Sequence, residues 1–129
     1  MSNLTAIANS GSSKANPLLI SIAKTAPNTG ARRNAVLVLS RGRNDKEVLA
    51  TLEELYGSSS DNVEVRRAVV SSIGRSADPR AVTILGNIVK NDSDETIRRT
   101  AIQLLGNRKE PEAMKALEDI LKEAPKKRG

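Results

Sequence analysis

The feature of this sequence that most constrains its fold is an internal repeat. Three stretches align with one another without gaps, and the second and third begin 34 and 32 residues after the one before. The stretches are ARRNAVLVLSR at 31–41, VRRAVVSSIGR at 65–75 and IRRTAIQLLGN at 97–107. Such a period is typical of arrays in which each unit buries its apolar face only by stacking on its neighbours.

Apolar columns follow each of these stretches at helical spacing. The aligned positions hold Leu49, Val82 and Met114, then Leu52, Leu85 and Leu117, and then Leu55, Ile88 and Ile120. Leu19 and Ile22 extend two of the columns 33 residues upstream, which predicts a partial fourth unit over 1–26. Because an apolar stripe also lies within each aligned stretch, every complete unit is predicted to be a pair of helices.

Capping residues mark the predicted helix boundaries. Side-chain oxygens that can accept from unpaired amides stand before the first helices at Asn28, Asn62 and Asp94, and before the second helices at Asp45, Asp78 and Glu110. Pro79 and Pro111 follow at the first helical position, where a missing N–H is not needed. Gly74 and Gly106 are expected to end first helices through a left-handed residue or a close backbone approach.

Two short helices cannot bury their own apolar faces, so the predicted fold is all-α. We expect an α-solenoid, a right-handed superhelix of stacked antiparallel helix pairs with repeats of 32–34 residues. The expected divisions are a partial N-terminal repeat at 1–26, repeats at 27–57, 58–92 and 93–124, and a basic tail at 125–129, after a helix that Pro125 stops.

The pattern from Val65 to Leu85, with Val-Arg-Arg, Ile-Gly and then Asp-Pro-Arg-Ala-Val, resembles HEAT repeats of the short phycobilin-lyase type. The resemblance covers residues 28–122 well and 4–24 weakly. It implies scaffolds, chromophore-lyase subunits, regulatory modules or a few enzymes on one framework. It also implies that the first Arg of each Arg-Arg pair bridges to an acidic loop residue, with Arg32 on Asp45, Arg66 on Asp78 and Arg98 on Glu110.

Charge separates the two helix layers. The first-helix segments 30–43, 63–75 and 95–109 carry net charges of +4, +2 and +3, and the second-helix segments 45–56, 78–90 and 110–123 carry −3, +1 and −3. We therefore place a partner-binding face on the first helices, where residues outside the apolar columns differ between repeats. The face comprises Arg33, Asn34, Leu37, Arg41, Arg67, Ser71, Arg75, Arg99, Gln103 and Asn107.

Composition argues against an enzyme. The chain has no His and no Cys, so the commonest general base, the thiolate nucleophile and most zinc ligands are missing. We expect no catalytic residue, cofactor or metal, and a scaffold that binds another protein. The alternative is a nucleic-acid binder that grips phosphates through the Arg stripe, without base stacking because Tyr56 is the one aromatic residue. A phycobilin-lyase-like subunit is a further alternative.

The partial N-terminal unit predicts an unfilled neighbour interface. We expect the chain to be a fragment of a longer array, or an array whose open N-terminal end meets another surface, including a second copy. Leu4, Ile7, Leu18, Leu19 and Ile22 would form that end. No stretch approaches the roughly 18 consecutive apolar residues of a membrane span, and the absence of Cys fits a reducing, cytoplasmic location.

Overall fold

The fold is built of α-helices alone in the portion of the chain that the structure describes. The computed structural model describes residues 17–42 and 45–128. Its helices are α2 (Pro17–Thr25), α3 (Thr29–Leu39), α4 (Asp45–Ser58), α5 (Val63–Gly74), α6 (Arg80–Asn91), α7 (Glu95–Gly106) and α8 (Pro111–Arg128). None of these helices is both long and apolar enough to cross a membrane.

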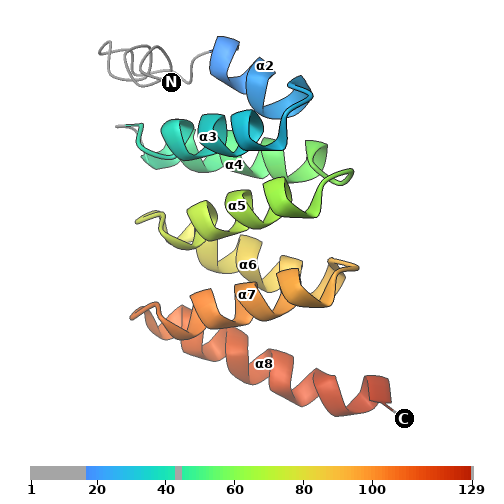
Figure 1. Cartoon of the computed structure of the whole chain (residues 1–129). Helices are drawn as coiled ribbons and strands as arrows, with labels where there is room; N and C mark the ends of the chain where they lie inside the picture. The colour runs from blue at the N-terminus through green and yellow to red at the C-terminus, as the bar shows by residue number, and fades with distance from the viewer. Residues whose placement is uncertain (1–16, 43–44, 129) are drawn as a thin grey trace.

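The helices stack one after another from α2 to α8, as the predicted solenoid requires (Figure 1). The first helices α3, α5 and α7 pack against each other and form one layer. The second helices pack behind them, with α2 against α4 and α6 against α8. The chain is therefore an α-helical solenoid, and the first-helix layer presents three successive helices on one side.

The first helices begin where the capping column predicts. The Asn28 side chain accepts from the Ala31 amide at 3.0 Å, and the Asn62 side chain accepts from the Val65 amide at 3.1 Å. Asp94 does the same for the amides of Thr96 and Ile97. Each cap satisfies donors that have no partner inside the helix, so the N-cap prediction for the first helices is confirmed.

The second helices begin with related but less uniform chemistry. Pro111 is the first residue of α8, as predicted. In α6 the helix begins at Arg80, one residue after Pro79, and the Asp78 side chain still accepts from the Arg80 amide at 2.9 Å. The hydrogen bond from the Arg80 guanidinium also lowers the pKa of Asp78.

The core is a continuous aliphatic layer between the helix pairs. The columns predicted in α4 and α6 are buried, with Leu49, Leu52 and Leu55 at 1% exposure and Leu85 at 0%. The column assignment is wrong at Met114, which is 60% exposed. Met114 is exposed because no described helix covers the outer side of α8, whereas Ala113, which aligns with the buried Ala81, stays buried.

Glycine is the last residue of two first helices, α5 and α7, but only one of the two positions requires it. A Cβ on Gly74 would lie 2.6 Å from the Leu104 side chain, so α5 and α7 approach closely at this point. Gly106 has open space around the same position. The close approach predicted for this glycine column is thus confirmed at Gly74 and wrong at Gly106.

The two ends of the chain depart from the predictions. Helix α8 continues to Arg128, so Pro125 does not stop it. Only residues 126–128 follow Pro125 in the helix, so the lost amide donor and the crowded carbonyl four residues earlier affect the end of α8 alone. At the other end Leu19 is fully buried, Leu18 is 54% exposed and Ile22 lies against the core. Leu4 and Ile7 lie outside the described residues.

Candidate functional site

A groove of about 590 Å³ lies between α3 and α5 on the first-helix layer. Its lining residues are Arg33, Asn34, Leu37, Glu64, Arg67, Ala68, Ser71 and Arg75. Six of them belong to the predicted partner-binding face. The structure thus brings six of the predicted residues together around one hollow.

Helical periodicity explains why these side chains share the groove. On α5, Arg67 and Ser71 are four residues apart, and Arg75 follows after another four, so all three project from the same side. Arg33 and Leu37 have the same spacing on α3. The preceding residue in each helix, Arg32 or Arg66, is rotated by about 100° and points away from the groove.

A smaller cavity of about 200 Å³ adjoins the groove where α3 and α5 end. Arg41 lines this cavity, and Leu37 and Arg75 line both hollows. The remaining predicted residues, Arg99, Gln103 and Asn107, are exposed on α7. They lie on the helix beside α5 and line neither hollow, so the predicted face divides into a grooved region and a region on α7.

Two acidic residues, Glu64 and Glu95, pair with Arg residues of the predicted face and reduce its positive charge. Neither was among the residues predicted for the face. The Arg33 guanidinium lies 3.9 Å from the Glu64 carboxylate, and Arg99 donates to Glu95 at 2.7 Å. Both carboxylates stand in the first turn of a first helix, where the helix dipole favours negative charge. That position is the signal that could have placed them there.

The unpaired cations of the face lie at one end of the groove. Arg67 donates to the Thr96 hydroxyl at 3.3 Å. The side chains of Arg41 and Arg75 are exposed and make no hydrogen bond or ion pair with a described residue. The cations without an acidic partner among the described residues therefore lie near the C-terminal ends of α3 and α5.

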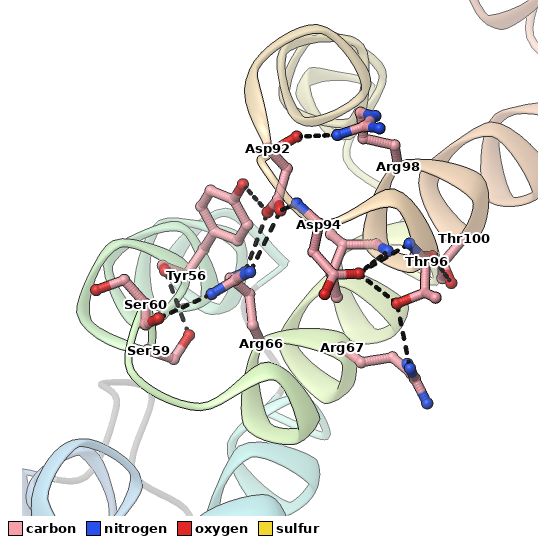
Figure 2. Close-up of polar contacts among 11 residues, drawn as sticks. Tyr56, Ser59, Ser60, Arg66, Arg67, Asp92, Asp94, Thr96, Arg98 and Thr100 are labelled. Atoms are coloured by element: carbon pink, nitrogen blue, oxygen red, sulfur yellow. Dashed lines mark hydrogen bonds and ion pairs between the residues drawn. The ribbon is translucent and has the colours of Figure 1, made fainter.

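The first Arg of each pair has a structural role, but its predicted partners are wrong. Arg32 pairs with Asp61 at 3.2 Å, not with Asp45, and Arg66 pairs with Asp92 at 3.1 Å, not with Asp78. Arg98 donates to the Asp92 backbone oxygen at 2.7 Å, not to Glu110 (Figure 2).

The reason for these partners is the position of each Arg along its helix. Arg66 is the fourth residue of the twelve-residue α5, so it lies near the loop before α5, where it donates to the Ser60 carbonyl, and near the equivalent loop after α6, where Asp92 stands. The residue predicted as its partner, Asp78, lies beyond the other end of a helix that is about 18 Å long. Asp78 and Glu110 are held instead by nearby Arg80 and Arg108, which lower the pKa of each carboxyl.

The Asp92 carboxylate is the centre of a buried polar cluster between repeats (Figure 2). It accepts from the Tyr56 hydroxyl at 2.5 Å, from Arg66 and from the Asp94 amide at 2.8 Å. Burial, together with the hydrogen bond donated to Asp92, raises the pKa of Tyr56. Every polar atom named here is used to join the loops, so we assign this cluster to the fold and not to ligand binding.

Within the described ranges, no group of three or more acidic side chains is arranged to hold a metal ion. A third hollow, of about 270 Å³, lies between α6 and α8 and includes Lys90, Glu112 and Asp119. None of its lining residues belongs to the predicted face.

Helix pairs stacked in register with a recurrent capping and Arg column define a helical-repeat protein. The family model for HEAT repeats matches residues 58–128, more than half of the chain. The chain belongs to the HEAT repeat family, and residues 31–57 extend the same aligned columns upstream. No curated protein and no solved structure matches it.

Proposed function

We propose that the chain is a non-enzymatic scaffold that holds an extended acidic segment of a partner protein in the groove between α3 and α5. HEAT repeats are commonly protein-interaction scaffolds, and solenoids present extended surfaces for binding. The observation that carries the proposal is the groove itself, which combines Arg67 and Arg75 with the aliphatic surface of Leu37 and Ala68. Such a mixed lining suits a peptide with acidic and apolar side chains.

The same groove argues for a protein segment over nucleic acid. Glu64 lines it beside Arg33, and Glu95 neutralises Arg99 on the next helix. A site that binds the nucleic-acid backbone gains affinity because its cations neutralise successive phosphates. Carboxylates placed among the Arg residues would repel those phosphates. A peptide can instead place a cationic or polar residue against Glu64 and its acidic residues against Arg67 and Arg75.

Selection from a displayed library of random peptides on the full chain tests the proposal. We expect enrichment of peptides that contain acidic and aliphatic residues, with micromolar affinity by fluorescence anisotropy. Reversal of charge with Arg67→Glu is expected to weaken these peptides by at least about tenfold, equivalent to 1.4 kcal/mol. Its effect on the free energy of unfolding should stay within about 0.5 kcal/mol, because Arg67 is exposed.

The matched control is Lys115→Glu, which reverses an exposed charge on α8, in the second-helix layer. This variant should bind the selected peptides as the unaltered chain does. Titration with random duplex DNA at two salt concentrations tests the alternative, nucleic-acid binding. Micromolar, salt-sensitive duplex binding that Arg67→Glu and Arg99→Glu abolish, with no peptide enriched, would replace the proposal by nucleic-acid binding.

At the level of subtype, we propose that the repeats are of the short phycobilin-lyase type. The segment from Val65 to Leu85 supports this, because some of its Arg-Arg, Gly and Asp-Pro positions recur in the next repeat, at Arg98, Gly106 and Pro111. No feature of the groove favours a chromophore, so the scaffold function does not depend on the subtype.

A further inference from the structure

We infer that the small cavity at the C-terminal ends of α3 and α5 binds a phosphoryl group on a phosphorylated serine or threonine of the partner segment. The inference rests on the proposed function, since the segment in the adjoining groove would carry that group. The cavity, of about 200 Å³, is lined by Leu37, Ser40, Arg41, Val48, Ser72, Arg75 and Ser76. It therefore brings two guanidinium groups and three hydroxyls to one place.

A buried hydroxyl in the cavity has no partner. Ser72 is 3% exposed, and its Oγ is buried without any hydrogen bond. The residues aligned with it in the other repeats are Val38 and Leu104. Packing at this position thus does not call for a hydroxyl, and an unsatisfied buried hydroxyl is destabilising. A ligand oxygen in the cavity would supply the missing hydrogen-bond partner.

The two cations are not used to cap the helices that they follow. At the end of α3 the Ser40 hydroxyl donates to the Leu37 carbonyl at 2.6 Å. At the end of α5 the Arg108 guanidinium donates to the Gly74 carbonyl at 3.1 Å. Because other groups serve these carbonyls, the side chains of Arg41 and Arg75 stay available to a ligand.

Arg108 orders this end of α5 beside the cavity. Its guanidinium is paired with the Glu110 carboxylate at 2.7 Å, so it contributes hydrogen bonds to the helix end and no unpaired charge. It donates to the Ser76 carbonyl at 2.8 Å and so fixes the loop that carries Ser76. The Ser76 Oγ accepts from the Asp78 amide at 3.1 Å, which leaves its own O–H free to donate into the cavity.

The number and charge of these groups favour a phosphoryl group over a carboxylate. A phosphoserine side chain carries a charge of about −1.5 to −2 near neutral pH and three acceptor oxygens, which match two guanidinium groups and flanking hydroxyls. No carboxylate is among the described residues that line the cavity. The acidic residue of the wider groove, Glu64, lies in the first turn of α5, at the other end of that helix.

Titration of the full chain with O-phospho-L-serine, followed by NMR chemical shifts, tests the site. We expect saturable shifts centred on the amides of Ser72, Arg75 and Ser76, and an affinity at least about tenfold above that for free glutamate. Arg75→Gln should reduce the phosphoserine affinity by about tenfold or more. Lys115→Gln is the matched control, because it removes an exposed cation of the second-helix layer, outside the partner-binding face, and it should leave the affinity unchanged.

Ser72→Val separates ligand binding from a structural role. Valine is the residue that the first repeat holds at this position, so the variant should keep or raise the melting temperature while it weakens phosphoserine binding. Three results would each overturn the inference: absence of saturable shifts, unchanged affinity in both Ser72→Val and Arg75→Gln, or equal affinity for glutamate.

Two further results distinguish the phosphoryl site from nucleic-acid binding and from the proposed scaffold function. Duplex DNA that displaces phosphoserine and spreads the shifts to Arg99 would assign the cavity to a nucleic-acid track and overturn the inference. Selected peptides that depend on Arg67, together with no phosphoserine binding, would overturn the phosphoryl site alone and leave the scaffold function standing.

Discussion

At the scale of single residues, Asp92 joins two repeats through one buried carboxylate. Its side chain is 3% exposed and that of its partner Arg66 is 9% exposed. The Tyr56 hydroxyl and the Asp94 amide complete its hydrogen bonds. Removing one member of a buried ion pair leaves the other charge without compensation, which is the costly event at such a site.

We expect Asp92→Asn to lower the free energy of unfolding by about 3 kcal/mol, because Arg66 then stays buried and unpaired. Chemical denaturation followed by circular dichroism measures this loss. Tyr56→Phe removes one neutral donor and should cost about 1 kcal/mol. Glu95→Gln is the matched control, because Glu95 pairs with Arg99 and both side chains are exposed, at 64% and 72%. An equal loss in Asp92→Asn and Glu95→Gln would contradict the assignment of Asp92 as the buried joint.

Four carboxylates with Arg or amide partners make the free energy of unfolding depend on pH in the acid range. Hydrogen bonds hold the pKa of four groups below its ordinary value, namely Asp61, Asp78, Asp94 and Glu110. Their contribution is complete above the unfolded-state pKa of about 4 and is lost as the pH falls through the lower folded-state values.

The free energy of unfolding should therefore decrease as the pH falls below about 5. These groups should cause no decrease between about pH 5 and neutral pH. Denaturation at a series of pH values measures the slope. Glu110→Gln removes one of the four groups and should make the slope shallower. Stability that stays level from about pH 5 to pH 3 would show that these pairs persist in the unfolded chain.

At the scale of helices, the approach of α5 to α7 depends on Gly74. A Cβ at this residue would lie 2.6 to 2.8 Å from three atoms of the Leu104 side chain. Leu104 packs against the core, so it has little freedom to move aside. Gly106 occupies the same column at the end of α7 and has open space around it.

Gly74→Ala should destabilise the array by about 1 to 3 kcal/mol through overpacking. Gly106→Ala should be neutral or stabilise by up to about 1 kcal/mol, because alanine loses less backbone entropy than glycine. Thermal unfolding of the two variants measures the contrast. Leu104→Ala in the Gly74→Ala background should recover some of the loss, and a Gly74→Ala variant as stable as Gly106→Ala would mean that the helices separate freely.

Repetition made the helices predictable. Core positions such as Leu52 and Leu85, and N-cap residues such as Asn62, recur every 32–34 residues. The same helix-forming pattern is therefore present several times in the sequence. The prediction failed where a residue's surroundings differ between copies. Met114 occupies a buried column but lies on a helix whose outer side is uncovered, and Gly106 has no neighbour like Leu104.

The candidate site was partly predictable for the same reason. Spacing of four residues placed Arg67, Ser71 and Arg75 on one side of α5, where the groove lies. The sequence does not say which loop lies near a given helix end, so Arg66 was assigned to Asp78 when its partner is Asp92. The free hydroxyl of Ser72 depends on three-dimensional packing and has no signal in the sequence.

At the scale of the whole molecule, the stack leaves apolar side chains exposed near both of its described ends. Leu18 is 54% exposed on α2, and Met114 and Leu121 are 60% and 68% exposed on α8. The residues aligned with Met114 and Leu121 one repeat earlier, Val82 and Val89, are buried at 6% and 8% exposure. The outer side of α8 thus repeats a surface that another helix covers inside the array.

We expect the chain to self-associate head to tail, with the outer side of α8 in one copy against α2 of the next. The physical reason is that the exposed columns have the pattern that internal repeats bury, and buried aliphatic area favours association. Light scattering should show a mass that rises with concentration from the micromolar to the millimolar range. Because the two surfaces differ, Leu18→Lys and Met114→Lys should each prevent association alone.

The matched control is Ala50→Lys, which places the same charge on an exposed apolar residue of α4. This variant should associate as the unaltered chain does, because α4 lies inside the stack, in contact with α2 and α5. Association that Leu18→Lys abolishes and Met114→Lys does not would instead indicate a symmetric contact between two N-terminal ends. A monomer at every concentration would show that neither end is used, and that Leu18 and Met114 are ordinary exposed apolar residues.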